Sequence, residues 1–247
     1  MKLTLMLLPM ALAAATALRA EPLLPAFDPA AFDPADAVTN PYFPLASGYM
    51  REFVGTADSK DGKPVQENGV QSFVGEGPVL GGVQTVMVLD NVWQDGRHVE
   101  EAKDYYAQDR DGNVWYMGED VTNFNYDAAG NMTGTDSHGS WRVGVNDAKP
   151  GFAMPGAPVP GFAYEQEHSP LDEAMDVGEV MAVDGKLSGP CGDSVDVLTV
   201  YETSSIDPDL REVKYYAKGV GMIRVDEGVD ATRANPEASA DLIRANN

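Results

Sequence analysis

Disulfide bonds are excluded as a means of stabilising this chain, because its 247 residues contain one cysteine, Cys191. A single thiol has no internal partner, so stability must come from a packed core. Cys191 follows Gly189-Pro190 and has no histidine or basic residue close to it in sequence that would activate it as a nucleophile. We therefore predict a buried or half-buried structural thiol.

Catalytic signatures are also missing. The sequence has no Gly-x-Ser-x-Gly elbow, no phosphate-binding glycine loop and no dinucleotide fingerprint. Its three histidines, His98, His138 and His168, are far apart in sequence, so zinc ligation would depend on convergence in the fold. A binding protein is favoured over an enzyme, with a hydrolase that uses a histidine and carboxylates as an alternative hypothesis.

Basic residues are scarce: 17 lysines and arginines stand against 39 aspartates and glutamates. An acidic surface repels nucleic acid and anionic lipid headgroups, which excludes nucleic acid as a partner. It favours solubility, and it could also attract cations.

Long apolar runs are confined to residues 3–18, which follow Lys2 and end in Ala17-Leu18-Arg19-Ala20. This stretch is short for a membrane span and precedes a small-residue cleavage point. We interpret residues 1–20 as a signal peptide, so the mature protein is expected in the periplasm or secreted, without stable membrane insertion.

Residues 21–39 form a proline-rich leader in which Phe27-Asp28-Pro29 and Phe32-Asp33-Pro34 nearly repeat. Dense prolines oppose regular structure, so the leader is either an arm laid on the body, anchored by Phe27 and Phe32, or a flexible linker.

Residues 40–228 alternate short β-type runs with turn signals, which is typical of an antiparallel β domain. Strands are expected over residues 49–56, 70–74, 84–93, 99–109, 114–117, 140–145, 162–168, 177–183, 195–203, 212–217 and 221–226. Asp-Gly pairs at residues 61–62, 95–96, 111–112 and 184–185 predict tight hairpin turns, and Gly130 marks a further turn.

Two segments depart from this pattern. Residues 149–161 contain four prolines and three glycines and predict a long irregular loop. In the tail, residues 229–247, Asn235-Pro236 resembles an N-cap followed by a first-position proline, which predicts a short helix over residues 236–244. The expected fold class is mainly β, a single large curved antiparallel sheet or an open barrel or sandwich, with this C-terminal helix.

Large aromatic side chains recur on successive expected strands. If they share one face of a curved sheet, they either line an apolar groove that holds a small ligand or fill the core. The predicted groove residues are Tyr105, Trp115, Tyr116, Trp141, Tyr215 and, from the proline-rich loop, Phe152. The predicted function is the binding of a small apolar ligand, with a structural or protein-partner module as an alternative.

A second binding hypothesis concerns Asp109-Arg110-Asp111-Gly112-Asn113, whose oxygen-bearing side chains could wrap a calcium ion. The glycine and acidic spacing does not match an EF-hand, so a hairpin turn is favoured. A looser calcium site would use Asp109, Asp111, Asn113 and Asp120, with Glu119 as a further candidate.

Three segments carry a resemblance. They are residues 40–45 (Asn-Pro-Tyr-Phe-Pro-Leu), residues 105–116, which contain Asp-Gly-Asn-Val-Trp-Tyr, and residues 215–224, which contain Tyr-Ala-x-Gly-Val-Gly. They look like motifs of a family of uncharacterised exported bacterial β-rich proteins, loosely similar to lipoprotein carriers. The resemblance implies a curved antiparallel sheet and an exported location. It implies no catalytic residues, and a lipid-carrier role would rest on fold analogy alone.

Overall fold

The computed structural model describes residues 21–33, 37–58 and 63–246. The predicted signal peptide and the Asp61-Gly62 turn lie outside the described residues. The described part is almost entirely β, and its one helical element is the 3-10 turn η1 (Pro29–Ala31). The strands are β1 (Met50–Asp58), β2 (Pro64–Leu80), β3 (Val83–Gln94), β4 (Arg97–Gln108), β5 (Val114–Tyr126), β6 (Met132–Asp136), β7 (Trp141–Arg142), β8 (Lys149–Met154), β9 (Ala163–Glu165), β10 (Glu167–His168), β11 (Asp176–Gly189), β12 (Gly192–Ser204), β13 (Arg211–Ala217), β14 (Gly221–Glu227) and β15 (Ala238–Asn246).

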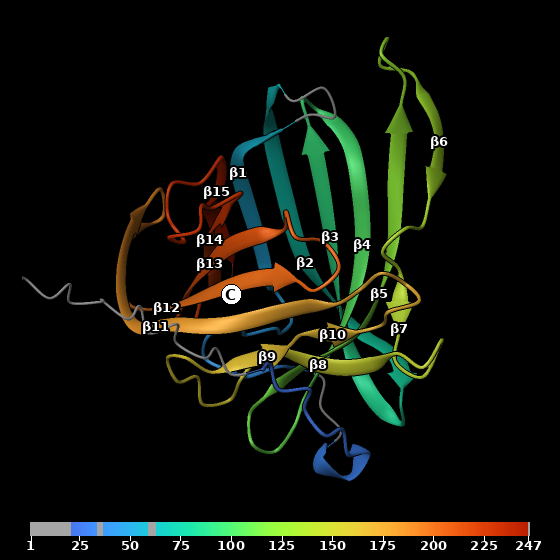
Figure 1. The fold of residues 1–247 in the computed structure, drawn as a ribbon, viewed down its shortest axis with the longest axis vertical. Helices are drawn as coiled ribbons and strands as arrows, with labels where there is room; N and C mark the ends of the chain where they lie inside the picture. The colour runs from blue at the N-terminus through green and yellow to red at the C-terminus, as the bar shows by residue number, and fades with distance from the viewer. Residues whose placement is uncertain (1–20, 34–36, 59–62, 247) are drawn as a thin grey trace, which may run out of the picture.

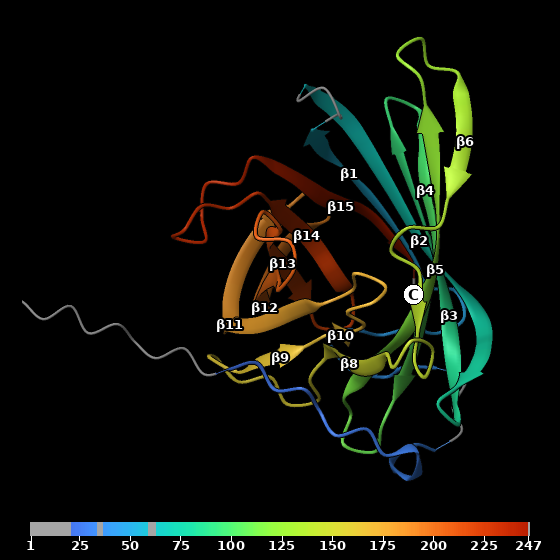
Figure 2. The same ribbon diagram turned by 45° about the vertical axis from the view of Figure 1, so that its right-hand side comes forward.

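All these strands belong to one antiparallel sheet, in the order β10-β8-β5-β4-β3-β2-β1-β15-β14-β13-β12-β11-β9, with β6 and β7 also paired to β5. In Figure 1 strands β2 to β5 run roughly vertically, whereas β11 and β12 run across them. Figure 2 shows the two groups as facing walls of a strongly curved sheet. Among the expected architectures, the structure therefore selects a nearly closed, barrel-like sheet.

The two ends of the strand order meet in one short piece of chain. β9 pairs with β11, and β10 pairs with β8, so only Gln166 separates the strands at opposite ends of the sheet. The close approach needs Gly151, where a Cβ would lie 2.1 Å from the carbonyl oxygen of Glu165. The segment from β9 to β10 thus brings the sheet close to a closed ring.

The Asp-Gly turn expected at residues 95–96 is present, and both of its residues have positive φ. Asp95 and Gly96 join β3 to β4 with φ of 48° and 77°, as a tight turn between twisted strands needs. The turn expected at Asp184-Gly185 is wrong, because β11 continues through it with irregular pairing to β12. Long-range pairing with β12 absorbs the Asp-Gly pair as a bulge.

The β11–β12 hairpin turns instead at its tip, where Gly189 pairs with Gly192. Cys191 lies in this tip and is exposed, so the prediction of a buried or half-buried thiol is wrong. The physical reason is the shift of the turn: a residue at a two-residue hairpin tip projects into solvent and has no core to enter.

The predicted C-terminal helix is wrong, because residues 238–246 form strand β15. This strand pairs with β1 on one side and β14 on the other. Ala240 and Leu242 are buried, whereas Ile243 is 44% exposed, a period of two that suits a strand. Asn235 caps no helix, and its side chain donates to Asp230 at 2.8 Å. Pairing with two strands outweighs the local N-cap signal.

The proline-rich segment is only partly irregular. Its first part is strand β8, which pairs with β5 and β10 and buries Phe152, Ala153 and Met154. Residues 155–162 have no strand, as expected. The prediction failed over β8 because apolar residues packed against Trp115 outweigh the local effect of Pro150.

The leader lies against the body of the protein. The rings of Phe27 and Phe32 contact each other and the ring of Trp115, with centroid distances of 5.5–5.8 Å. Arg110 adds an ion pair to Asp33 at 3.2 Å. These contacts correspond to the arm interpretation of the leader.

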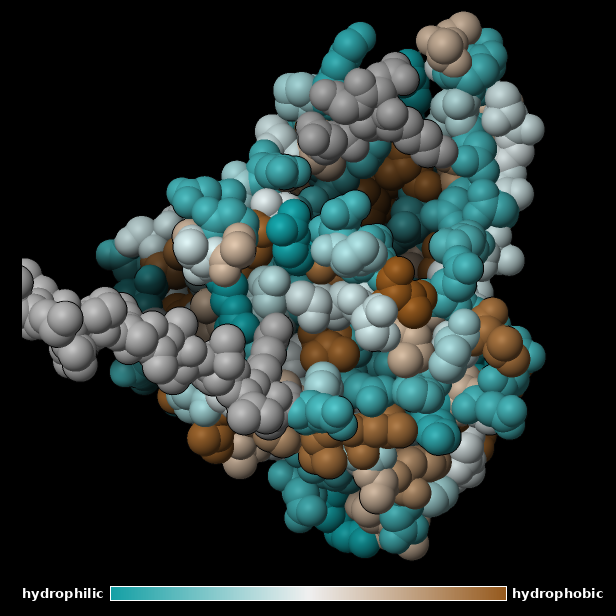
Figure 3. All heavy atoms as spheres, in the orientation of Figure 1, coloured by the Kyte–Doolittle hydropathy of each residue, from teal (hydrophilic) through white to brown (hydrophobic). Residues whose placement is uncertain are grey.

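The main hydrophobic cluster lies inside the curved sheet and joins its two walls, with Val114, Met117 and Met154 from one side and Val180 and Leu198 from the other. Hydrophilic residues cover much of the face shown in Figure 3, and hydrophobic residues appear there in smaller patches. No helix within residues 21–33, 37–58 and 63–246 has the length and apolar character needed to cross a membrane.

Candidate ligand-binding cavity

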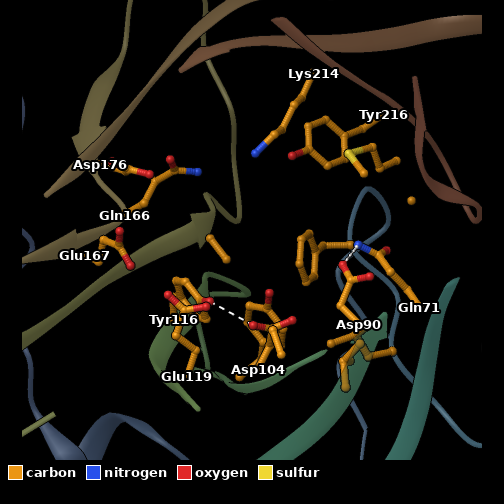
Figure 4. Close-up of a pocket in the computed structure, with 18 of the residues that line it drawn as sticks. Gln71, Asp90, Asp104, Tyr116, Glu119, Gln166, Glu167, Asp176, Lys214 and Tyr216 are labelled. Carbon is orange, nitrogen blue, oxygen red and sulfur yellow. Dashed lines mark hydrogen bonds between the residues drawn. The ribbon is translucent and has the colours of Figure 1, made fainter. Parts of the chain in front are cut away.

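A cavity of about 320 Å³ lies between the two walls of the sheet. Such a volume falls at the lower end of the range for small-molecule sites. β2, β3, β4 and β5 line it from one wall, β11 to β14 from the other, and the loop before β1 covers it with Phe43, Pro44 and Leu45. Figure 4 shows side chains from both walls pointing toward this common space.

Strand alternation selects which side chains of β4 face the cavity. Glu100, Ala102, Asp104 and Tyr106 line it, and residues two apart share one face of a strand. Tyr105 therefore points to the opposite face, where its hydroxyl donates to Asp120 at 2.8 Å.

A bulge in β5 places two further residues in the cavity. Tyr105 pairs with Gly118 and Tyr106 with Tyr116, so the pairing skips Met117. The skipped residue reverses the alternation, and both Tyr116 and Glu119 consequently face inward. Gly118 allows this with φ of 140°, and a Cβ there would lie 2.6 Å from the carbonyl oxygen of Trp141.

Aromatic rings form one part of the cavity wall. Tyr106 and Tyr116 stack with ring centroids 5.0 Å apart and an interplanar angle of 17°. Phe43 meets Tyr106 edge to face at 5.1 Å, and Tyr49 and Tyr216 complete the aromatic lining. Burial raises the pKa of Tyr49 to about 12 and those of Tyr106, Tyr116 and Tyr216 well above the usual value, so these phenols remain neutral.

Carboxylic acids form the other part of the wall. Seven of them line the cavity, from six different strands: Asp90, Glu100, Asp104, Glu119, Glu167, Asp176 and Glu202. Lys214 is the one basic residue among the described residues that line it. The ammonium group of Lys214 pairs with Glu202 at 2.5 Å and with Glu212 at 3.3 Å, so most of the cavity acids have no basic partner there.

The acids are only partly satisfied by neutral donors. Tyr116 donates its hydroxyl to Asp104 Oδ1 at 2.9 Å, and Gln71 donates to Asp90 Oδ2 at 2.8 Å; dashed lines mark both bonds in Figure 4. Asp90 Oδ1 and Glu167 Oε2 are buried without a hydrogen-bond partner among the described residues. A buried acceptor in this state costs about 1–3 kcal/mol.

Burial and mutual repulsion weaken the acidity of this cluster. Burial raises the pKa of Asp104 to about 7. It does the same for Asp90, with the charge of Asp104 as the second cause. Burial, and then the charge of Asp176, raises the pKa of Glu167 to about 8. Burial also raises the pKa of Glu119 well above its usual value. Strongly perturbed acids in a cavity are typical of functional sites.

Of the residues predicted to bind an apolar ligand, Tyr116 lines the cavity. Trp115 and Phe152 pack together at 4.7 Å in the core beneath it, and Trp141 contacts Tyr116 edge to face at 5.4 Å. Tyr215 donates to Asp226 on the opposite face of its strand, as Tyr105 does to Asp120. The structure therefore gathers the neighbours Tyr106 and Tyr216 at the cavity, in place of Tyr105 and Tyr215.

Of the predicted calcium residues, Asp109 and Asn113 are in contact, because the side-chain amide of Asn113 donates to Asp109 Oδ2 at 2.8 Å. Asp109 accepts hydrogen bonds from the backbone of Asp111 and Asn113 and from the indole of Trp115, which makes it the organiser of the β4–β5 turn. Asp120 pairs with Arg142 instead. Within the described ranges, no group of three or more His, Cys, Asp or Glu side chains could hold a metal ion.

The histidines lie in three separate places. His98 stacks on Trp93 at 5.0 Å. His138 pairs with Glu173 at 2.9 Å, and His168 pairs with Glu165 at 2.6 Å. None of the three belongs to the lining of the cavity, so the geometry brings no histidine to the cavity acids.

The three segments that carry the family resemblance meet around the cavity. Residues 43–45 cover it, Tyr106 and Tyr116 stack along it, and Tyr216 lines it with Gly221 and Met222. Asn40 helps to hold the covering loop, because its side chain donates to the carbonyl oxygens of Gly112 and Pro155.

The cavity acids were missed in the sequence because both faces of the strands carry polar residues. In β4, inward-facing Glu100 and Asp104 alternate with Glu101 and Lys103, so polarity alone does not identify the inner face. A usable signal was the period-two set Glu100, Ala102, Asp104 and Tyr106, but its orientation depends on pairing with β3 and β5.

Comparisons with known proteins place the chain in no family: no family model matches it, and no curated protein matches it. A solved structure that matches is described as "a putative lipoprotein from Parabacteroides distasonis". It is 11% identical, with a TM-score of 0.36, over 86% of this chain and 100% of that chain. Similarity this low carries no argument about fold or function, so the resemblance to exported β-rich proteins stays a prediction.

Proposed function

We propose that this protein binds a small molecule in the cavity between the two walls of its sheet. The observation that carries the proposal is an internal space of about 320 Å³ that the protein leaves unfilled although its walls present stacked aromatic rings and buried acceptors without partners. Protein interiors are otherwise packed closely, and a convergent set of aromatic and polar groups in a cavity is the usual form of a ligand site.

The lining supports a ligand with an apolar body. Phe43, Tyr106 and Tyr116 offer ring faces and edges, and Leu45 and Met222 add aliphatic surface. This part of the proposal retains the apolar ligand expected from the sequence, but assigns it to the lining of the cavity, which includes only Tyr116 of the six predicted residues. An exported, unanchored carrier would suit such a site, and export itself stays part of the proposal.

Native mass spectrometry on the protein isolated gently from its own source tests the proposal. We expect a non-covalent organic mass on the wild type. Ala102→Leu should lose it, because Ala102 is 4% exposed and lines the cavity. Ala129→Leu, in an exposed turn, should keep it. Circular dichroism checks that both variants fold.

A bare polypeptide mass would count against the proposal when combined with a second result. That result is an identical small-fragment binding profile, by ligand-detected NMR, for the wild type and Ala102→Leu. Together they would show that the cavity takes up no small molecule.

A further inference from the structure

The cavity wall carries a strong excess of acidic groups over basic ones, which restricts the charge of any ligand. The described lining contains seven carboxylic acids and one basic residue, Lys214. The ammonium group of Lys214 is already paired with Glu202 and Glu212. An anionic ligand would meet repulsion from every wall and would find no free cation among the described lining residues. A neutral apolar ligand would leave the carboxylic acids buried without compensation.

Two carboxylate oxygens of the cavity also lack a hydrogen-bond donor in the described part of the chain. Glu167 is 7% exposed, and its Oε2 atom has no hydrogen-bond partner among the described residues, although the indole of Trp141 lies close enough to lower its pKa. Across the cavity, Asp90 Oδ1 also has no hydrogen-bond partner among the described residues, although the backbone N–H of Asn91 lies close enough to lower the pKa of Asp90. Both oxygens can accept a hydrogen bond from an N–H group of a ligand. Such a bond is stronger when one of its partners is charged than when both are neutral.

The aromatic part of the cavity wall also suits a positively charged ligand. Tyr106, Tyr116 and Phe43 form one continuous aromatic cluster, and ring faces attract ammonium groups. A metal ion fits less well, because the acids are distributed over six strands and form no group of three that could hold one within the described residues.

We propose that the ligand is a protonated primary amine with a small aromatic or aliphatic body, held by the buried carboxylates and the tyrosine rings of the cavity. This inference rests on the proposed function, because it assigns the class of molecule that the cavity binds. The ammonium group of a primary amine carries three N–H donors, so it can satisfy Glu167 or Asp90, whichever it lies beside, and it supplies the positive charge that the wall is missing.

Isothermal titration with three matched probes tests the inference at fixed ionic strength. The probes are 2-phenylethylamine, 2-phenylethanol and phenylacetate, which share a phenyl body and differ in charge. We expect the amine to bind at least about tenfold more tightly than the alcohol and phenylacetate to bind most weakly. Equal or tighter binding of the alcohol or the acid would overturn the inference and leave the proposed function intact.

Variants show whether the amine senses the cavity acids. Because one ammonium group lies beside only one of these two acids, at least one of Glu167→Gln and Asp90→Asn should weaken amine binding about tenfold or more, and both should leave alcohol binding unchanged. Unchanged amine binding in both variants would overturn the assignment. Glu76→Gln is the matched control, since it removes one negative charge at an exposed position. An equal loss in Glu76→Gln would indicate only the general field of an acidic protein and would overturn the assignment to the cavity.

Binding should also depend on pH. Asp90 and Asp104 have pKa values of about 7 and Glu167 of about 8, and the groups that face them are Glu100, Glu119, Asp176, Glu202, Lys214 and the tyrosines. These acids become ionised as the pH rises from 6 to 8, while an alkylamine stays protonated. Amine affinity should therefore increase over this range, with protons released on binding, and alcohol affinity should stay constant.

Failure of the inference is distinguishable from failure of the proposed function. If none of the three probes binds at millimolar concentration, the amine class is refuted. The mass carried by the wild type and lost from Ala102→Leu then decides separately whether the cavity binds another kind of molecule.

Discussion

Replacing Asp104 by asparagine should stabilise the protein, and the gain should grow with pH. Asp104 is 7% exposed. Burial, opposed by the hydrogen bond from Tyr116, holds its pKa at about 7 in the folded protein, against about 3.9 in an unfolded chain. The folded state therefore retains the proton that the unfolded state loses as the pH rises through this window. Because the unfolded state binds fewer protons there, stability falls as the pH increases from about 4 to about 7.

The magnitude follows from the two pKa values. Between pH 5 and pH 8, a carboxyl group with these values loses about 2–3 kcal/mol of folding free energy. Asparagine does not titrate, so the difference in unfolding free energy between Asp104→Asn and the wild type should widen by about this amount. The amide oxygen of the introduced asparagine could still accept the bond from Tyr116, so the packing of the site should be unchanged.

Urea denaturation of both proteins at pH 5, 6, 7 and 8 is the assay. Asp120→Asn serves as a control, because Arg142 and Tyr105 hydrogen-bond its side chain and lower its pKa against the effect of burial, so its difference from the wild type should be constant above pH 5. Parallel curves for the wild type and Asp104→Asn would refute the conclusion that Asp104 takes up a proton near neutral pH.

Two further predictions concern the closure of the sheet. Gly151→Ala should destabilise the protein by about 1–3 kcal/mol, because a Cβ would meet the carbonyl oxygen of Glu165 at 2.1 Å; Gly189→Ala, with nothing within 4 Å, should stay within about 0.5 kcal/mol of the wild type. Equal effects in chemical denaturation would show that β9 and β10 do not press on β8. Leu242→Ala should cost about 2–5 kcal/mol and the neighbouring Ile243→Ala much less, since their side chains are 2% and 44% exposed. Thermal melts that showed the reverse order would contradict the placement of β15.

The sequence predicted the positions of the strands better than the way in which the strands pair. Most of the expected strands coincide with observed ones, because alternation and Asp-Gly turns are local properties of the chain. Predictions based on glycine and proline were wrong where pairing with distant strands determines the local structure. Strand β11 runs through the expected turn at Asp184-Gly185, and β8 begins at Lys149 within the expected loop. Strand β15 forms where a helix was expected after Pro236.

The site was harder to predict because it depends on the parity of residues within strands. Tyr105-Tyr106 and Tyr215-Tyr216 identify the right strands, but one step along a strand exchanges cavity for outer face. The β5 bulge at Met117 also reverses which residues of β5 face the cavity, and Gly118 is the only local sign of it in the sequence. The acids of the cavity come from six strands, and their proximity exists only once the sheet has curved.

The pairing of β15 with β1 has a consequence for the order in which this protein folds. It joins Met50 to Asn246, so the first strand of the sheet pairs with the last strand that the structure describes. Hairpins such as β2–β3 and β11–β12 need only residues that are close in sequence. Contacts between residues as distant as those of β1 and β15 slow folding. We therefore expect the β1–β15 pairing to form after the local hairpins and to limit the rate at which the sheet is completed.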